Sequence, residues 1–206
     1  MNLGEGGRRG RRGLLALTSI ASFMVALDLL VVATALTTIQ SDLAASTETV
    51  QWIVTAYGLT FAGLLMTGAG LGDRFGRRCV FTIGLAVFAA ASVGCALAPT
   101  VEWLITARAV QGAGAALVMP LAVALLGAGV PAEERGRALG VFEGLTGLAT
   151  IAGPLVGGAV AQLAGWQWIF WVNVPIAVLL IVALGRWVEE SYGPDGGLDI
   201  ATEWPL

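Results

Sequence analysis

Residues 50–97, VQWIVTAYGLTFAGLLMTGAGLGDRFGRRCVFTIGLAVFAAASVGCAL, contain two long apolar runs separated by a short charged turn. The runs, Val50 to Leu71 and Val80 to Leu97, each approach the roughly 20 residues with which an α-helix crosses a hydrocarbon core about 30 Å thick. The turn between them combines arginines with an aspartate and two glycines. This pattern predicts two transmembrane helices joined by a tight polar turn.

The same pattern extends through the rest of the chain. Of its 206 residues, 57% are hydrophobic and 12% are charged, and the mean hydropathy is +0.83. Soluble domains carry about 25% charged residues. Helices are favoured over strands because lipid offers the backbone no hydrogen-bond partner, and the alternating pattern of barrel strands is missing from the sequence. We therefore expect an all-α membrane protein with six transmembrane helices, at Leu14 to Leu36, Val50 to Leu71, Val80 to Leu97, Val101 to Leu126, Ala138 to Ala164 and Ile169 to Val188.

The basic residues indicate the orientation. All eleven are arginines. Positive residues near span ends stay in the cytoplasm, so we expect a multi-pass protein of the cell (plasma) membrane with both termini cytoplasmic. A secretory signal peptide fits the start poorly, because the first apolar run exceeds the usual length of about 7–15 residues and contains Asp28. Ten arginines fall on the predicted cytoplasmic side: Arg8, Arg9, Arg11, Arg12, Arg74, Arg77, Arg78, Arg135, Arg137 and Arg186.

The six spans divide into two groups of three, joined by the charged segment Gly127 to Arg137. Three crossings carry the chain to the opposite side, so the second group begins with inverted orientation, as in the inverted repeats of many transporters. The expected organisation is a basic cytoplasmic N-terminus (1–13), a first three-helix repeat (14–97), a second three-helix repeat (98–188) and a polar cytoplasmic tail (189–206).

Three ionisable residues interrupt the apolar spans, where a charge is costly unless it faces a cavity or a partner. Asp28 lies roughly 12 Å and Arg108 roughly 10 Å from the outer ends of their predicted spans, at the helical rise per residue. Because the first and fourth spans are equivalent in an inverted repeat, we expect a charge pair or a proton relay. The alternative is a structural ion pair that only holds two helices together. For Glu143 we expect an interfacial role, and the alternative is proton binding.

The charged turn resembles a family signature. A basic anchor would explain its arginines but not an aspartate placed among them with glycines on either side. Residues 69–78 resemble G-x-L-x-D-R-x-G-R-R/K, the loop between spans two and three of the major facilitator superfamily, with Ala69 in place of the first glycine. The resemblance implies a gating loop formed by Gly72, Asp73, Arg74, Gly76, Arg77 and Arg78.

Two further stretches strengthen this resemblance. Residues 108–114, RAVQGAG, resemble the R-x-x-Q-G-x-G motif whose arginine is implicated in proton transfer in the family. Residues 153–158, GPLVGG, resemble the core of the antiporter motif, with Ala149 where a glycine is usual. The resemblance implies proton coupling and transport roles for Asp28, Arg108 and Gln111, and an antiporter motif formed by Gly153, Pro154, Gly157 and Gly158.

Shorter matches, including Leu27-Asp28, Trp52 with Tyr57 and residues 168–175, are similar to the fourteen-span drug:proton antiporters of the superfamily. Gln167 departs from their pattern, as do positions in the first span. Members of the family have a second six-helix bundle, so the expected partners are the lipid bilayer, protons, a small-molecule substrate, and either the missing C-terminal half or a second copy of the chain. Two interpretations of the chain length stay open, namely a truncated product and a half-transporter that dimerises.

The resulting functional hypothesis is proton-coupled export of small amphipathic organic compounds, as in drug or antibiotic efflux. The alternative is a non-transporting membrane fragment that only folds or associates with a full-length relative. The sequence has no histidine, nucleotide-binding loop or metal-ligand cluster, so we expect no enzyme activity, catalytic residue, cofactor or metal. The arginines before the first span are explained by topology, and no nucleic acid is expected as a partner.

Overall fold

The computed structural model describes residues 3–193, apart from the side chains of residues 3–9 and 162, and this part of the chain is helical without strands. The expected tail residues 194–206 lie outside the described residues. Six helical segments are long and apolar enough to cross a membrane, which confirms the predicted all-α membrane fold; α6 and α7 together form the sixth. The helices are α1 (Leu3–Asp42), α2 (Thr47–Phe75), α3 (Arg77–Ala96), α4 (Val101–Gly129), α5 (Ala132–Leu163), α6 (Gln167–Trp171) and α7 (Asn173–Trp187).

Helix starts on one side of the bundle are fixed by short polar side chains. Ser46 Oγ accepts a hydrogen bond from the backbone N–H of Thr49, at 3.2 Å, and Thr100 Oγ1 accepts one from that of Trp103, at 3.3 Å. These contacts satisfy N–H groups that a first helical turn leaves unpaired. The polar residues between apolar runs therefore define where α2 and α4 begin.

Several helices are longer than the apolar runs predicted. α1 continues to Asp42, beyond the predicted end at Leu36, so Asp28 lies farther from the end of its helix than expected. The segment expected to be a long charged connection at residues 127–137 is mostly helix, because α4 ends at Gly129 and α5 begins at Ala132. Hydropathy locates the lipid-spanning core of a helix, whereas the hydrogen-bonded helix extends into the polar interface.

The helices pack as two inverted repeats. α1 packs lengthwise against α5, and α4 packs lengthwise against α2. Exchanging α1 with α4 and α2 with α5 converts one pair into the other, as a two-fold relation between the triplets requires. Both contacts use glycine to bring backbones together: Gly157 of α5 lies against Val31 of α1, and Gly68 of α2 lies against Ala116 of α4. This is the arrangement predicted for one half of a major facilitator fold.

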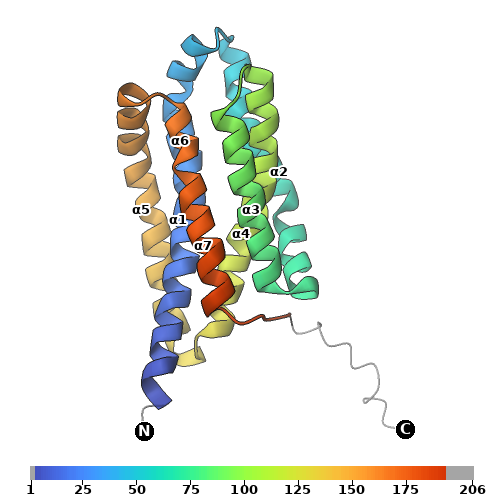
Figure 1. Cartoon of the computed structure of the whole chain (residues 1–206), viewed down its shortest axis with the longest axis vertical. Coiled ribbons are helices and arrows are strands. Elements are labelled where there is room, and N and C mark those ends of the chain that lie inside the picture. The colour runs from blue at the N-terminus through green and yellow to red at the C-terminus, as the bar shows by residue number, and fades with distance from the viewer. Residues whose placement is uncertain (1–2, 194–206) are drawn as a thin grey trace, which may run out of the picture.

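The arginine-rich end of the bundle is the end that holds the N-terminus of α1, the α2–α3 and α4–α5 connections, and the C-terminus of α7 (Figure 1). One apolar cluster lies toward this end and includes Leu17, Phe88 and Leu121. A second cluster lies toward the opposite end and includes Ile39 and Leu104. Both clusters include residues of α1, and Asp28 lies between these two groups of residues.

Much of α2 and α5 remains uncovered, since their apolar stretches are far less buried than those of α1, α3 and α4. Met66 on α2 is 82% exposed and Leu155 on α5 is 72% exposed. In a membrane such faces contact lipid or another helical bundle, because both are apolar.

Candidate functional site

The central feature of the bundle is a buried ion pair between α1 and α4. Arg108 Nη1 donates to Asp28 Oδ2 at 2.5 Å, and both side chains are fully buried. The structure thus brings together the two charges that the sequence placed on the first and fourth spans. Removing either partner of such a pair leaves an uncompensated buried charge, which costs about 3–5 kcal/mol.

Arg108 makes several further contacts across the bundle. Its Nε donates to the carbonyl oxygen of Ile53 on α2 at 3.3 Å, and its Nη1 donates to Gln111 Oε1 at 2.7 Å. The guanidinium carbon lies 4.1 Å from the centre of the Tyr57 ring and 5.9 Å from that of Phe170. An aromatic face stabilises a desolvated cation electrostatically. The remaining nitrogen, Nη2, is buried without a hydrogen-bond partner.

The second oxygen of Asp28 is held by two neutral amides. Gln111 Nε2 on α4 donates to Asp28 Oδ1 at 3.0 Å, and Asn173 Nδ2 on α7 donates to the same atom at 2.7 Å. Gln111 Nε2 also donates to Ser92 Oγ on α3 at 2.9 Å. A single polar cluster therefore joins α1, α3, α4 and α7 between the two apolar clusters.

Sequence reasoning placed Asp28, Arg108 and Gln111 in the site but missed Asn173 and Ser92. Cys95 also contacts the cluster, with Sγ 3.5 Å from Gln111 Oε1. Neutral polar side chains carry a weaker signal than charges, because hydroxyls and amides occur in membrane helices for packing alone. For Asn173, the available signal was an amide within an apolar span two residues before Pro175, where a helix often breaks.

The predicted gating loop forms the joint between α2 and α3. Gly76, with φ of 101°, adopts a backbone conformation that favours glycine and separates the two helices. Arg77 Nη2 lies 2.7 Å from Asp73 Oδ1, so this ion pair bridges the joint. The guanidinium carbon of Arg74 lies 5.3 Å from the centre of the Phe75 ring, so Arg74 lies outside the Asp73–Arg77 ion pair. Gly72 packs against Leu121 of α4.

The segment after α7 is fastened to this same joint. Glu190 accepts hydrogen bonds from the backbone N–H groups of Arg78, at 2.7 Å, and Cys79, at 3.1 Å. The Arg78 side chain donates to the carbonyl oxygen of Val188 at 2.8 Å. Arg77 N–H donates to the carbonyl oxygen of Ser191 at 2.8 Å. The carboxylate of Glu190 thereby caps the N-terminus of α3.

The glycines of the predicted antiporter motif do not share one face. Gly153 lies against Leu30 of α1 and Gly157 against Val31, so both are covered within this bundle. Pro154 is exposed, and a side chain at Gly158 would meet nothing within 4 Å. The three glycines therefore form no continuous flat surface in this bundle. Two of them serve the contact between α1 and α5.

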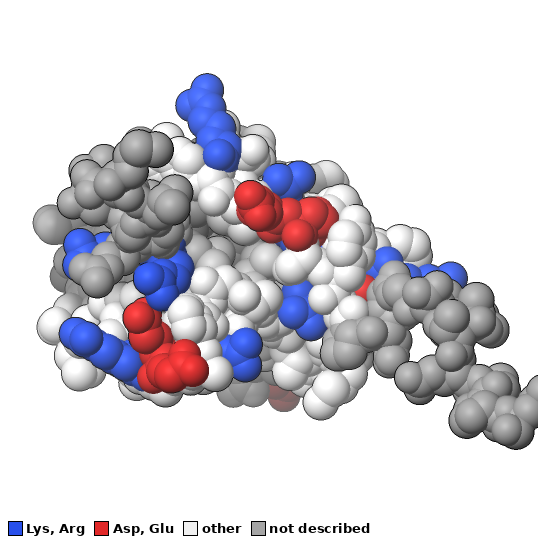
Figure 2. Space-filling view, turned by 90° about the horizontal axis from the view of Figure 1, so that it is seen from below, with Lys and Arg blue, Asp and Glu red and all other residues white. Residues whose placement is uncertain are grey.

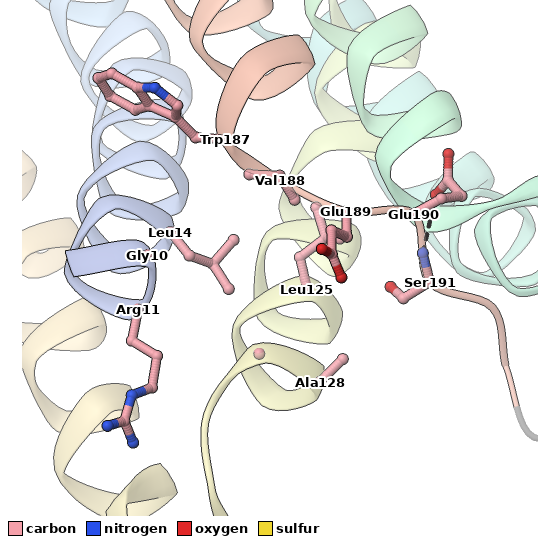
Figure 3. Close-up of a pocket in the computed structure, with 11 residues that line it drawn as sticks. Gly10, Arg11, Leu14, Leu125, Ala128, Trp187, Val188, Glu189, Glu190 and Ser191 are labelled. Carbon is pink, nitrogen blue, oxygen red and sulfur yellow. Dashed lines mark hydrogen bonds between the residues drawn. The ribbon is translucent and has the colours of Figure 1, made fainter. Parts of the chain in front are cut away.

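Basic and acidic side chains alternate across the arginine-rich end (Figure 2). Two cavities of about 450 Å³ each open there. In the first, Leu14 of α1 and Leu125 of α4 flank the space below Trp187, while Glu190 and Ser191 form another edge (Figure 3). The second lies between α1 and α5 and is lined by Arg12 and Arg137 among others. Neither cavity reaches Asp28.

Other sequence candidates stay apart from the buried cluster. Glu143 is exposed on α5. Trp166 is 2% exposed and donates from Nε1 to Asp42 Oδ2 at 2.7 Å. Among the described residues, no group of His, Cys, Asp and Glu side chains is arranged to hold a metal ion.

An all-helical bundle with membrane-spanning helices and a fully buried charged cluster defines a class of polytopic membrane proteins in which intramembrane charges mark transport pathways. Residues 18–202 match the family model described as Major Facilitator Superfamily. The chain belongs to the Major Facilitator Superfamily, as its motifs predicted.

Several curated relatives have names that match the predicted subgroup. The chain is 39% identical to the Multidrug resistance protein Stp of Mycobacterium tuberculosis over 86% of its own length and 33% of the relative. It is 42% identical to the Methylenomycin A resistance protein of Streptomyces coelicolor, over 90% of the chain and 40% of the relative. It is 40% identical to the Tetracenomycin C resistance and export protein of Streptomyces glaucescens, over 86% and 33%. The chain spans about a third to two fifths of these relatives.

Proposed function

We propose that this chain forms a six-helix half of a proton-coupled exporter of small amphipathic organic compounds. The observation that carries the proposal is the fully buried Asp28–Arg108 pair, held between apolar clusters in a member of a transporter family. Relatives with multidrug resistance, antibiotic resistance and export in their names support efflux as the direction of transport. Ionisable side chains buried inside a membrane bundle are costly, and they commonly mark the pathway of an ion or a substrate.

In this proposal Asp28 is the proton acceptor and Arg108 is its counter-ion. Protonation neutralises Asp28 and removes the attraction that holds Arg108 to α1, so the packing of α1 against α4 becomes sensitive to the proton gradient. Gln111 is placed to respond, because it contacts both members of the pair. Coupling then results from alternating between a charged and a neutral carboxyl in the same buried position.

The gating loop and the antiporter motif have separate roles in the proposed cycle. The Asp73–Arg77 pair bridges the joint between α2 and α3, where a change of helix angle would be transmitted. Gly153 and Gly157 keep α5 close to α1, the helix that carries Asp28. Movement of α1 on protonation would therefore be passed to α5.

The arginine-rich end is assigned to the cytoplasm of the cell (plasma) membrane by the positive-inside rule, which places both ends of the described helical bundle there. The exposed apolar faces of α2 and α5 suit a second six-helix bundle. This partner is a C-terminal six-helix half or a second copy of the chain. No enzymatic step is required of any residue.

A second candidate function is that of a fragment that folds or associates with a full-length relative without moving substrate. The observation that favours it is the exposure of the apolar faces of α2 and α5, which suits a contact with another helical bundle. The central ion pair would then serve only to hold α1 and α4 together.

Uptake of a fluorescent cationic dye into inside-out vesicles under an imposed proton gradient tests the proposal. The chain is produced alone and together with the C-terminal part of a full-length relative. Asp28→Asn and Arg108→Ala remove the two charges, and Glu143→Gln is the matched control for loss of a carboxylate from an exposed site on α5. An intact full-length relative serves as the positive control.

Gradient-dependent uptake in either preparation, lost in both pair variants and retained in Glu143→Gln, supports proton-coupled export. Uptake by the chain alone identifies a self-assembling half, whereas uptake only with the C-terminal part identifies an incomplete transporter. If neither preparation transports while the chain is fully inserted and the full-length relative is active, the fragment function replaces the proposal.

A further inference from the structure

The two oxygens of Asp28 have different hydrogen-bond environments. Oδ1 accepts from Asn173 Nδ2 at 2.7 Å and from Gln111 Nε2 at 3.0 Å. Oδ2 accepts from Arg108 Nη1 at 2.5 Å. Each oxygen of an ionised carboxylate offers about two lone-pair sites. Both sites on Oδ1 are therefore occupied, whereas one site on Oδ2 is open to a proton.

We propose that Asn173 is a positioning residue that, together with Gln111, keeps Oδ1 as the hydrogen-bonded carbonyl and so directs protonation of Asp28 to Oδ2, the oxygen beside Arg108. The role of Asn173 in transport rests on the proposed function, whereas the choice of the protonated oxygen concerns the Asp28 carboxyl group alone. In the step, one O–H bond of a hydronium ion breaks and one O–H bond forms on Oδ2, which leaves a water molecule. The net charge of the cluster rises by one.

The choice of oxygen decides what protonation does to Arg108. A proton on Oδ2 removes the negative charge from the atom that Arg108 contacts. Arg108 then remains as a buried cation with the Tyr57 and Phe170 rings beside it and with Nη2 still lacking a hydrogen-bond partner. Such a cation is costly until it moves or finds another acceptor. The amide contacts on Oδ1 persist meanwhile, so α1 keeps its hydrogen bonds to Asn173 of α7 and Gln111 of α4 while it loses the ion pair with Arg108.

The local structure of the sixth span places Asn173 for this task. α6 ends at Trp171 and α7 begins at Asn173, and Pro175 lies in the first turn of α7, where its missing N–H leaves no helical hydrogen bond unmade. Asn173 is 5% exposed. An amide keeps its donor whether or not the carboxyl is protonated, because it does not titrate.

The ionisable groups that surround Asp28 come from three helices. α4 contributes Arg108, α2 contributes Tyr57, and α3 contributes Cys95, which lies behind Gln111. α7 contributes the neutral amide of Asn173. Removing that amide takes one hydrogen-bond donor from Oδ1 without changing any charge, so the carbonyl stretch of the protonated carboxyl reports the lost contact.

Infrared difference spectroscopy of the 206-residue chain in lipid nanodiscs, recorded across a pH titration, tests this assignment. Asp28→Asn identifies the carbonyl stretch that belongs to protonated Asp28. Asn173→Leu removes the amide but keeps the number and branching of the side-chain heavy atoms, Asn173→Gln keeps an amide, and Val172→Ala is the control at the neighbouring half-exposed position.

We expect the Asp28 carbonyl stretch to lie at the low frequency of a doubly hydrogen-bonded group in the unchanged chain. In Asn173→Leu it should move to higher frequency. Asn173→Gln should return the frequency toward the unchanged value, and Val172→Ala should leave it in place. Asn173→Ala removes the same donor and replaces the leucine variant if that variant does not fold.

Equal carbonyl frequencies with and without the Asn173 amide would overturn the proposal, because they would place the proton on Oδ1 or the amide elsewhere. Absence of any band that depends on Asp28, at every pH where the chain stays folded, would overturn it as well. The spectra require no transport. A shifted band in a chain that fails the dye assay therefore leaves this assignment standing while the proposed function fails.

Discussion

Glu190, which follows the last described helix, caps the first turn of α3 by accepting the backbone N–H of Arg78 at 2.7 Å. Its second oxygen accepts from Cys79 N–H at 3.1 Å. The two contacts join segments more than a hundred residues apart in sequence and fix the end of the sixth span to the joint of the predicted gating loop.

Replacing Glu190 with alanine should destabilise the bundle by about 0.5–2 kcal/mol, the range for loss of a helix cap. Two N–H donors at the start of α3 lose their acceptor, and the helix dipole loses a nearby anion. Equilibrium unfolding in detergent measures the change. Glu189→Ala is the control, since Glu189 is exposed. Equal stability of the two variants would show that the cap contributes nothing.

Replacing Gly157 with a larger residue should destabilise the contact between α5 and α1. A Cβ there would lie 3.0 Å from both Cα and the carbonyl oxygen of Val31, and backbone cannot rotate away as a side chain can. Gly157→Val should therefore cost about 1–3 kcal/mol, the range for overpacking. Gly158→Val is the matched control on the adjacent residue, where a Cβ meets nothing within 4 Å. Thermal unfolding of both variants tests this prediction, and similar melting temperatures for Gly157→Val and Gly158→Val would contradict it.

The six spans could be predicted because lipid requires long apolar helices, and each apolar run is visible in sequence. The helix ends could not be predicted in the same way. Thr37 and Thr38 lowered the hydropathy after Leu36, yet polar residues at a membrane surface continue a helix without cost, and α1 runs on to Asp42. Hydropathy reports the solvent around a helix more directly than its hydrogen bonds.

The charged centre could be predicted because a buried charge demands a partner, and Asp28 and Arg108 lay at similar depths in symmetry-related spans. Asn173 and Glu190 could not be found in this way. An amide in a membrane helix has many uses, and Glu190 follows the final span, where an acidic residue is ordinary. Their roles depend on contacts across 145 and 112 residues of sequence, which local patterns do not encode.

Changing both members of the central pair should be less damaging than changing either. Arg108→Met leaves Asp28 without its counter-ion, and Asp28→Leu leaves Arg108 without its own, so each single variant should lose about 3–5 kcal/mol. The double variant removes both charges and should recover much of that loss. A double-mutant cycle by unfolding in detergent gives the coupling energy. Simple addition of the two losses would show that the charges do not act as a pair.

The ring of Tyr57 should stabilise Arg108 independently of Asp28. The guanidinium carbon lies 4.1 Å from the ring centre, and a desolvated cation over an aromatic face gains about 2 kcal/mol. Tyr57→Phe keeps the ring and should retain most of the stability, whereas Tyr57→Leu should lose it. Phe61→Leu is the control, because Phe61 stacks on Tyr57 at 6.2 Å and is a second aromatic residue of α2. If Tyr57→Leu and Phe61→Leu reduce the free energy of unfolding equally, the loss reflects aromatic packing alone. If Tyr57→Leu loses more, and the extra loss shrinks when Arg108 is also replaced by methionine, the extra loss comes from the contact between the ring and the cation.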